Sequence, residues 1–413
     1  MSWIDHTIWW HVYPLGFSGA VPAGPEPGRG LRSLIDWLDY ARDLGANGLA
    51  LGPICESVNH GYDTLDFLTL DRRLGTEADF VALAEACHER GFKLMLDGVF
   101  NHVAREHPWL QRALAEGPGS QYADLFAIDW TTPEPSLRLF EGHPELVELN
   151  HDSPQVAALI RDVMNHWLDR GADAWRLDAA YAVPPKFWRS VLPAVRERHP
   201  QAWFVGEVIH GDYAAYVRDS NLDAVTQYEL WKASWSSLAD ENFFEIDWSL
   251  QRHNDFLDRF TPMTFIGNHD VTRVATAAGL DRVVLALAIL MTCGGVPSIY
   301  YGDEQGLTGL KEERIGGDDV IRPPFPPQPG DLPPGGQWLY RAHQDLIGLR
   351  RRHPWLVQAR TTPVELTASH YVYASRSREG QELIVELSLD PLPKVEIRAS
   401  TGNVLYTWSS TEQ

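Results

Sequence analysis

The 413-residue sequence has few cysteines, a shortage of positive charge and no long apolar run. Its three cysteines, Cys55, Cys87 and Cys293, are too few and too scattered for a disulfide framework or a zinc site, so we expect them in the core. The 35 basic residues against 56 acidic ones give a net charge of −21, which argues against nucleic acid and an anionic membrane as partners. No stretch approaches the about 18 consecutive apolar residues of a membrane span.

The amino-terminal residues 1–6 contain no basic segment followed by an apolar one, so they are unlike a secretory leader. We therefore expect a cytoplasmic protein. The hydrophobic content of 44% is typical of a globular chain, and the length predicts one large α/β domain plus something smaller. Sixteen tryptophans are many for this length. Aromatic faces suit sugar rings, although most of these side chains should simply be core.

Short apolar strands alternate with helix-compatible segments over the first three quarters of the chain. One helix should begin at Ser153 and Pro154, a hydroxyl N-cap followed by proline at the first helical position. An eight-fold alternation of this kind predicts a (β/α)8 barrel, whose active site lies at the carboxyl ends of the strands. The expected strands lie within 8–13, 48–53, 92–100, 171–180, 202–207, 224–228, 263–268 and 297–301.

Two parts of the chain depart from this alternation. Residues 101–150 lack periodicity and are too long for an ordinary loop, which predicts a small subdomain inserted after the third strand. From Pro354 onward, alternating apolar residues and turn signals predict a small antiparallel β domain. The predicted division is therefore a TIM barrel formed by 1–100 and 151–353, the inserted subdomain 101–150, and a sandwich-like β domain 354–413.

Charged side chains follow four of the expected strands. Period-2 alternation puts Arg176 and Asp178 on one face of their strand, and Asp97, Glu207 and Asp270 stand at three other strand ends. In a barrel these ends converge on one cleft. Cleavage of a glycosidic bond needs one carboxylate to attack the anomeric carbon and a carboxylic acid to protonate the leaving oxygen. The alternative is a set of unrelated buried ion pairs, which would have to coincide with all four strand ends.

Four segments around these residues resemble, in order, the four sequence blocks of the α-amylase family, glycoside hydrolase family 13. They read DGVFNH at 97–102, WRLD at 175–178, GEV at 206–208 and FIGNHD at 265–270, and the resemblance runs from about residue 3 to 353. It implies Asp178 as nucleophile, Glu207 as general acid and base, and Asp270 as the residue that binds ring hydroxyls and favours distortion. The substrate-binding residues that it implies are Tyr62, Asp97, His102, Arg176, His210 and His269.

Within that set, the resemblance implies that Tyr62 stacks beneath the sugar and that Arg176 holds Asp178 ionised. The charges along the sequence agree with this assignment, because a neighbouring cation lowers the pKa of a carboxyl group. Glu207 has no such neighbour in the sequence, so its carboxyl group can stay protonated.

Further motifs resemble the neopullulanase and cyclomaltodextrinase group, which acts inside cells on short or cyclic α-glucans. They are SVNHGYDT at 57–64, LVELN at 146–150, GEVIH at 206–210 and GGDD at 316–319. The resemblance implies that Asp319 and Arg322 bind the neighbouring glucose unit, although Asp319 can equally be an ordinary turn acid. The amino-terminal β domain of that group, which helps to build its dimer, has no counterpart before the first strand, so a homodimer is left open.

The residues after the expected nucleophile, Asp178, differ from those of the cyclomaltodextrinase group and from those of ordinary α-amylases. Residues 179–183 lack the Asn-Glu pair of that group and the Lys-His pair of ordinary α-amylases, and Ile209 replaces a common tryptophan. We therefore expect unusual leaving-side subsites, with Tyr181 and Ile209 as the positions that set linkage choice. The missing histidine also removes a calcium ligand, and Asn101 and Asp152 alone do not form a cage for a hard cation. No metal and no cofactor is expected.

The sequence thus predicts a retaining α-glucoside hydrolase that cleaves α-1,4 and/or α-1,6 bonds of short or cyclic malto-oligosaccharides and releases maltose-sized products. A hydrolase of cyclic maltosyl-maltose is compatible with the group. Transglycosylation by the same site, in which a sugar hydroxyl replaces water, is the alternative. A non-catalytic binding relative is disfavoured because all three acids are present. Double displacement requires the carboxyl groups of Asp178 and Glu207 to lie about 5–5.5 Å apart.

Overall fold

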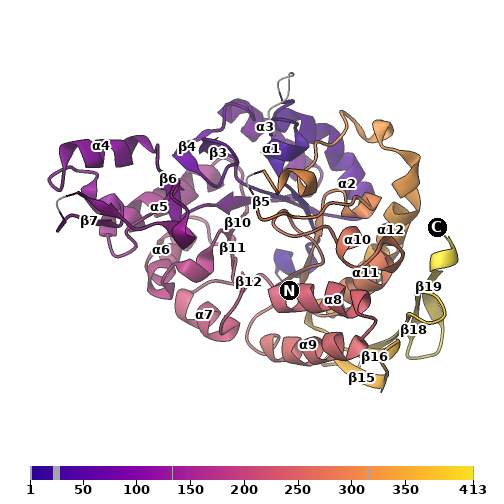
Figure 1. Cartoon of the computed structure of the whole chain (residues 1–413). Coiled ribbons are helices and arrows are strands. Elements are labelled where there is room, and N and C mark those ends of the chain that lie inside the picture. Colours follow the sequence, from indigo (N-terminus) through magenta and orange to yellow (C-terminus); the bar gives the residue numbers. More distant parts are fainter. Residues whose placement is uncertain (1, 22–27, 133, 315, 413) are drawn as a thin grey trace.

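The computed structural model describes residues 2–21, 28–132, 134–314 and 316–412. At its centre, eight parallel strands form one sheet in the order β12-β11-β10-β5-β2-β1-β14-β13. Figure 1 shows β5, β10, β11 and β12 in the middle of the molecule, with helices around them. A parallel bridge between Thr226 and Met263 joins the two ends of this order. Each strand therefore lies beside its predecessor in the chain, and the predicted (β/α)8 barrel is confirmed.

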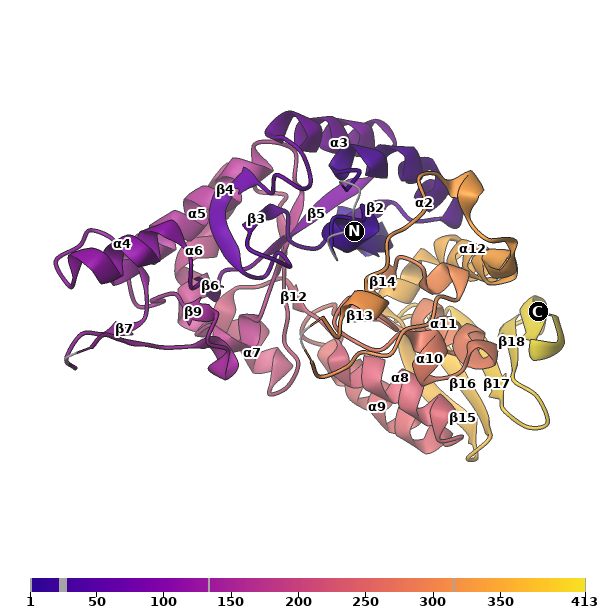
Figure 2. The ribbon, with the colours of Figure 1, turned by 45° about the horizontal axis from the view of Figure 1, so that its top comes forward.

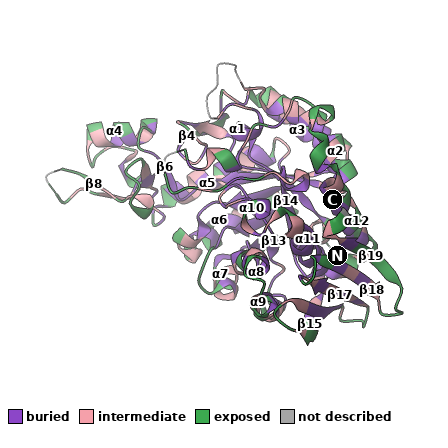
Figure 3. Ribbon diagram, turned by 45° about the vertical axis from the view of Figure 1, so that its right-hand side comes forward, coloured by how far each residue is buried: buried purple, intermediate pink, exposed green. Residues whose placement is uncertain are grey.

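The barrel strands are short and their inward and outward faces are both covered. They are β1 (Trp9–Val12), β2 (Gly48–Leu51), β5 (Lys93–Gly98), β10 (Ala174–Leu177), β11 (Trp203–Gly206), β12 (Ala224–Val225), β13 (Met263–Phe265) and β14 (Val296–Tyr300). Nearly all of their residues are buried, as Figure 3 shows, because helices cover a parallel sheet on its outer side.

The helices between and after these strands carry an apolar face toward the barrel. They are α1 (Pro14–Phe17), α2 (Leu38–Leu44), α3 (Glu77–Glu89), α5 (Pro154–Leu168), α6 (Pro185–Arg198), α7 (Tyr213–Ser220), α8 (Tyr228–Ala239), α9 (Phe243–Phe256), α10 (Val274–Ala277), α11 (Val283–Thr292) and α12 (Gln337–Arg352). All ten residues of α11 are buried, because this helix also contacts the carboxyl-terminal sheet. No helix in the described ranges is long and apolar enough to cross a membrane.

The chain between β5 and α5 leaves the barrel and projects to one side (Figure 2). It contains β6 (His102–Ala104), α4 (Pro108–Glu116), β7 (Ile128–Asp129), β8 (Ser136–Leu137) and β9 (Leu146–Glu148). Strands β6 and β9 pair antiparallel, which brings His102 opposite Glu148. The chain then returns at Ser153, whose side chain accepts a hydrogen bond from the Gln155 backbone N–H at 3.2 Å. The predicted insertion and helix cap are confirmed, whereas the exact domain bounds stay a prediction.

The carboxyl-terminal part forms the predicted antiparallel β domain. Its single sheet has the order β15-β16-β17-β18-β19. The strands are β15 (Arg360–Leu366), β16 (His370–Arg376), β17 (Glu382–Ser388), β18 (Lys394–Ala399) and β19 (Val404–Ser409). The sequence predicted a sandwich-like arrangement, but in the described residues α9, α11 and α12 contact this sheet and serve as its second layer.

Two local predictions differ from the structure. The strand expected over 224–228 ends at Val225, because the Gln227 side chain accepts hydrogen bonds from Glu229 and Leu230 backbone N–H groups and starts α8. A hairpin between β2 and α3, formed by β3 (Cys55–Ser57) and β4 (Thr64–Leu70), was not predicted. Cys55 is half-buried there, whereas Cys87 and Cys293 lie in the core as expected.

A buried ion pair joins the segments that follow β13 and β14. Arg273 donates hydrogen bonds to Asp303 Oδ1 at 2.9 Å and to the carbonyl groups of Tyr301 at 2.6 Å and Ile321 at 2.8 Å. The side chains of Arg273 and Asp303 are at most 1% exposed. These contacts fix the chain just before Arg322 against the loop that carries Asp270.

We therefore expect Arg273→Met to lower the free energy of unfolding by about 3–5 kcal/mol, because Asp303 would stay buried without a counter-charge. Urea titration followed by tryptophan fluorescence measures this. The matched control is Lys186→Met, which breaks the exposed pair of Lys186 and Asp152, whose side chains are 71% and 77% exposed. Equal unfolding midpoints for the two variants would contradict the role given to Arg273.

Candidate active site

A cavity of about 460 Å³ opens at the carboxyl ends of the barrel strands. It brings together Asp178 after β10, Glu207 after β11 and Asp270 after β13. The inserted segment supplies one wall. The other lining residues are His60, Tyr62, His102, Phe140, Glu141, His143, Leu146, Ala179, Tyr181, Ile209, Tyr228, Val271, Lys311, Asp318 and Arg322.

Arg176 on β10 links the acids of this cavity. Its Nη1 donates to both carboxylate oxygens of Asp97, at 2.6 and 2.7 Å, and to Asp178 Oδ1 at 3.2 Å. Its Nη2 lies 2.7 Å from Glu207 Oε1 and 3.9 Å from Asp270 Oδ2. The Arg176 side chain is only 8% exposed. The four acids expected at separate strand ends therefore surround one buried guanidinium group.

Glu207 accepts hydrogen bonds from further donors. The Tyr228 hydroxyl donates to Oε1 at 2.9 Å, and the Ala179 backbone N–H donates to Oε2 at 3.0 Å. Ala179 has a left-handed backbone, φ 44°, which turns this N–H toward Glu207 directly after the strand ends. Glu207 has no cationic neighbour in the sequence, but in space the second terminal nitrogen of Arg176 reaches it.

The pKa of Asp178 differs from the sequence expectation in direction. Burial raises this pKa well above its ordinary value, and the nearby charges of Glu207 and Asp97 add to the effect, although Arg176 opposes it. The sequence argument counted the cation and missed both the burial and the other two carboxylates. The raised pKa of Asp178 therefore depends on the carboxylates around it as well as on burial.

Asp270 has more cationic groups around it than Asp178. His269 Nε2 lies 2.9 Å from its Oδ2, and Arg322 Nη2 donates to its Oδ1 at 2.9 Å. Burial acts to raise the pKa of Asp270, but His269, Arg322 and Arg176 together hold it well below its usual range. An ionised carboxylate that is 30% exposed at the cavity can accept hydrogen bonds from sugar hydroxyl groups.

Tyr62 and His102 form the floor and one side of the cavity. The Tyr62 hydroxyl donates to Asp97 Oδ2 at 3.0 Å and contacts His269 Nε2, and its ring lies nearly parallel to that of His269. His102 Nε2 donates to the Tyr62 carbonyl oxygen at 3.0 Å, and its ring stacks on Phe140 with centroids 4.4 Å apart. Burial lowers the pKa of His102 to about 3, so it is a neutral hydrogen-bonding group near pH 7.

The expected leaving-side residues lie near one another. Tyr181 and Ile209 line the cavity, and the Tyr181 ring lies 5.4 Å from the ring of His210, which is exposed and does not line the cavity. The Tyr181 hydroxyl donates to Glu141 Oε1 at 2.8 Å, which connects the barrel to the inserted segment. Glu141 itself has a left-handed backbone, φ 48°.

The position predicted for Asp319 is off by one residue. Asp318 lines the cavity and its Oδ2 lies 2.9 Å from Arg322 Nη2, whereas Asp319 does not line the cavity. Asp318 and Arg322 flank the short 3-10 helix Asp319–Ile321, so both lie outside it and meet across its ends. Arg322 lines the cavity as predicted, but it is 7% exposed and is held by Asp270 and by the His269 carbonyl oxygen.

Sequence reasoning missed several side chains of the site besides Asp318, among them Phe140, Glu141, Tyr228 and Asn268. Tyr228 was placed in a strand, and Phe140 and Glu141 lie in the segment without periodicity. Of these four, Asn268 carried a signal, because it directly precedes His269 and Asp270 in the fourth block. Its side-chain amide donates to the Tyr228 hydroxyl at 2.9 Å.

Asn101 and Asp152, the two candidate calcium ligands in the sequence, contact other residues. Asn101 Nδ2 lies 3.2 Å from His102 Nδ1, and Asp152 is ion-paired with Lys186 at 2.7 Å. Across the described ranges, no group of three or more histidine, cysteine, aspartate and glutamate side chains is arranged to hold a metal ion.

A closed parallel barrel with paired carboxylates at its carboxyl end is an arrangement used for glycoside cleavage. The family model described as "Alpha amylase, catalytic domain" matches residues 11–323. The chain belongs to the α-amylase family.

The relatives narrow this result and confirm the resemblance to the cyclomaltodextrinase group. A cyclomaltodextrinase of Geobacillus thermopakistaniensis is 31% identical over 423 residues, which cover 93% of this chain and 68% of that protein. An intracellular maltogenic amylase of Bacillus subtilis is 30% identical over 339 residues, 75% of this chain and 57% of that protein. The chain thus spans only part of these relatives.

Among solved structures, the ligand-free cyclic α-maltosyl-(1→6)-maltose hydrolase of Arthrobacter globiformis has a TM-score of 0.82 and 25% identity. The alignment covers 99% of each chain. Unlike the longer relatives, the Arthrobacter globiformis hydrolase therefore aligns with the present chain over nearly the full length of both.

The raised pKa of Asp178 gives a pH-dependent prediction. Because the folded-state pKa lies above the ordinary 3.8, ionising Asp178 costs folding free energy as the pH rises above that value, and the cost vanishes below it. We expect Asp178→Asn to stabilise the protein by about 1–4 kcal/mol near pH 7, since Arg176 keeps two other carboxylates.

Thermal unfolding between pH 4 and 8 measures the difference, which should shrink toward pH 4. Asp318→Asn is the control, because this acid is 34% exposed and ion-paired with Arg322, so its removal should bring no gain. A lower melting temperature for Asp178→Asn at pH 7 would contradict the direction of the pKa shift.

Proposed function

We propose that the protein is a retaining α-glucoside hydrolase that cleaves α-1,4 and/or α-1,6 bonds of short or cyclic malto-oligosaccharides and releases maltose-sized products. The observation that carries this proposal is the grouping of Asp178, Glu207 and Asp270 around Arg176 in one sugar-sized cavity. The names of the relatives, a cyclomaltodextrinase and a maltogenic amylase, support the substrate class.

In the proposed reaction, Asp178 attacks the anomeric carbon while Glu207 gives its proton to the leaving glycosidic oxygen. The carbon–oxygen bond breaks and an ester forms between the sugar and Asp178. Glu207 then takes a proton from water, whose oxygen attacks the same carbon and releases Asp178. The anomeric configuration is inverted twice and so is retained.

This sequence of steps requires a proton on Glu207 and a negative charge on Asp178. Arg176 contacts both carboxylates, so it stabilises whichever of them carries the charge as the proton moves. The Tyr228 hydroxyl and the Ala179 N–H hold Glu207 in place throughout. We therefore assign to Arg176, Tyr228 and Ala179 the positioning of the two reacting acids.

Other residues would bind the sugar ring in the cleavage position. Asp270 would accept hydrogen bonds from ring hydroxyl groups and favour ring flattening, His102 would bind a further hydroxyl group, and Tyr62 would stack beneath the ring. The resemblance implies that His269 also binds the sugar, but its side chain is 0% exposed and does not line the cavity, so we assign to it the positioning of Tyr62 and Asp270. The Tyr62 ring is held by its hydrogen bond to Asp97, which supports this placement.

On the leaving side, we propose that Tyr181, Ile209 and Glu141 set the linkage choice. The hydrogen bond between Tyr181 and Glu141 crosses from the barrel to the inserted segment, and both residues line the cavity. Ile209 offers an aliphatic surface that is 38% exposed, rather than a flat aromatic one. Such a wall should tolerate a bent, α-1,6-linked or cyclic chain.

We also propose a cytoplasmic location, which the name of the intracellular relative from Bacillus subtilis supports. The homodimer stays a prediction, as do the division into domains at 100, 150 and 353 and the exclusion of nucleic acid, which rests on the net charge of −21.

The catalytic proposal predicts that Asp178→Asn and Glu207→Gln each lower kcat on maltotetraose and on cyclomaltodextrins by at least about 10²–10⁴-fold, the usual contribution of a positioned acid or base. Asp152→Asn, at an exposed site, is the control and should keep full activity. Proton NMR of the first product should show the α anomer. Near-native turnover of both variants would refute the proposal, and products longer than the substrate would show transfer instead of hydrolysis.

The leaving-side proposal predicts that Tyr181→Phe raises KM for cyclic or α-1,6-linked substrates several-fold, because the contact with Glu141 is lost. The kcat for a small aryl maltoside, whose leaving group does not reach this wall, should stay the same. Tyr122→Phe, which removes a hydroxyl in the inserted segment outside the cavity, serves as control. An equal change on all substrates would rule out a role in linkage choice.

A further inference from the structure

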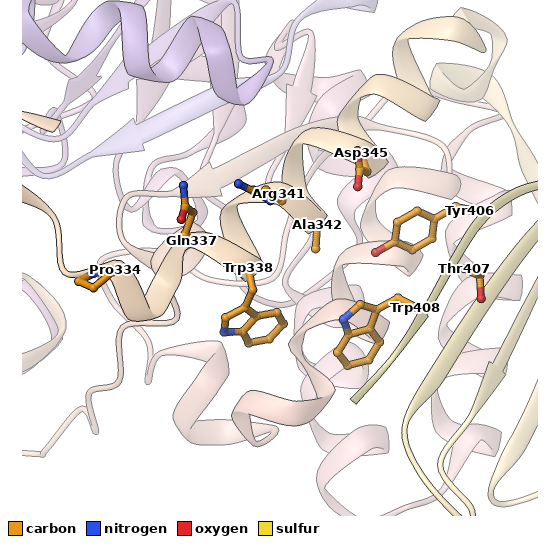
Figure 4. Close-up of a pocket in the computed structure, with 9 residues that line it drawn as sticks. All are labelled: Pro334, Gln337, Trp338, Arg341, Ala342, Asp345, Tyr406, Thr407 and Trp408. Atoms are coloured by element: carbon orange, nitrogen blue, oxygen red, sulfur yellow. The ribbon is translucent and has the colours of Figure 1, made fainter. Parts of the chain in front are cut away.

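A second cavity, of about 440 Å³, lies between α12 and β19, where the barrel meets the carboxyl-terminal sheet. Figure 4 shows Trp338 from the helix and Tyr406 and Trp408 from the strand pointing toward one another across it. Its size is within the usual range for a small-ligand site. None of its lining residues lines the active-site cavity.

The aromatic side chains form an ordered surface. The rings of Trp338 and Trp408 are nearly parallel, with planes inclined by 12° and centroids 6.2 Å apart. Tyr406 and Trp408 are two residues apart on β19 and so face the same side. Trp408 is buried at the base, Tyr406 is half-buried, and Trp338 is half-buried and leaves part of its ring open to a ligand.

Polar side chains border these rings along one face of α12. Gln337, Arg341 and Asp345 are spaced four residues apart, which places them in a row. All three are exposed, and within the described residues none of their side chains makes a hydrogen bond or ion pair. Arg341 and Asp345 could pair with each other at this spacing but do not. Their hydrogen-bonding capacity is therefore free for a ligand.

Another cavity lies beside this one along α12, and we call the two together the groove. This neighbouring cavity, of about 310 Å³, shares Pro334 and Gln337 with the first and is lined by Tyr40 and Tyr340, whose ring centroids are 4.7 Å apart. Aromatic side chains thus follow the helix on both sides of Gln337. This extent fits a chain of several units better than a single small molecule.

We propose that this groove is a second, non-catalytic binding site for a neutral oligosaccharide, an α-linked glucan. A pyranose ring is apolar on its face and hydroxylated at its rim, which matches aromatic rings bordered by unpaired hydrogen-bonding groups. One arginine and one aspartate balance in charge, which favours a neutral ligand over an ion. The choice of α-linked glucose among sugars rests on the proposed function.

The test uses the full chain carrying Asp178→Asn, so that the substrate is not consumed, and titrates it calorimetrically with maltoheptaose. We expect two binding sites per chain, of which one is lost or weakened at least about fivefold by Trp338→Ala. The exposed double substitution Arg341→Ala and Asp345→Ala should weaken the same site. Trp248→Ala on α9, whose side chain is 65% exposed, is the matched control and should change neither site.

The outcomes separate this inference from the proposed function. A single site that is insensitive to Trp338→Ala and to the double substitution would overturn the inference and leave the active-site proposal intact. A single site that depends on Trp338 would support the inference while counting against the catalytic cavity. If the chain forms a dimer that Trp338→Ala or the double substitution dissociates, and maltoheptaose leaves it unchanged, the groove is an interface with a second copy and the inference is wrong.

Discussion

The active-site geometry depends on one buried guanidinium group. Arg176 holds Asp97 through one terminal nitrogen, shares that nitrogen with Asp178, and reaches Glu207 with the other. Three carboxylates buried beside a single cation are an unfavourable arrangement, because the Coulomb gain does not repay the loss of hydration for all of them. The raised pKa of Asp178 is the expression of that imbalance. The crowding of carboxylates around Arg176 therefore both gathers the reacting acids and disfavours the ionised form of Asp178.

The barrel makes this arrangement possible. Its strands β5, β10, β11 and β13 end at the same edge, so acids from four distant parts of the sequence converge without a long loop. The second cationic group, Arg322, is fixed by contacts from the segments after β13 and β14 and keeps Asp270 ionised. The pKa values of Asp270 and Asp178 thus shift in opposite directions, because Asp270 contacts His269 and Arg322, while Asp178 is buried and shares Arg176 with other carboxylates.

The inserted segment closes the cavity from the opposite side. Phe140 stacks on His102, and Glu141 accepts a hydrogen bond from Tyr181. The backbone of Glu141 is left-handed, a conformation that costs free energy for a residue with a side chain. Such cost is commonly retained where it orients a functional group, which agrees with the proposed role of Glu141 on the leaving side.

Much of the fold could be predicted because each barrel strand is an apolar run bounded by glycine, proline or a polar turn. The acids were found because they stand at the ends of those runs. Tyr228 was missed because its backbone belongs to a helix that a glutamine side chain starts, and a propensity argument extends the strand through it. The pKa direction of Asp178 was wrong for another reason, since neighbours in sequence do not reveal burial or the approach of Glu207. Asp318 flanks a short 3-10 helix that Asp319 begins, a difference of one residue that the GGDD motif does not reveal.

The central claim is that Asp178 forms a covalent bond to the sugar while Arg176 and Glu207 hold it in place. An α-maltosyl fluoride with a fluorine substituent on the reacting ring slows both steps and allows the ester to accumulate. Mass spectrometry of the trapped, digested protein measures it directly. The account predicts one maltosyl group per chain, on the peptide that contains Asp178. A label on another acid, or no label together with an inverted product, would contradict it.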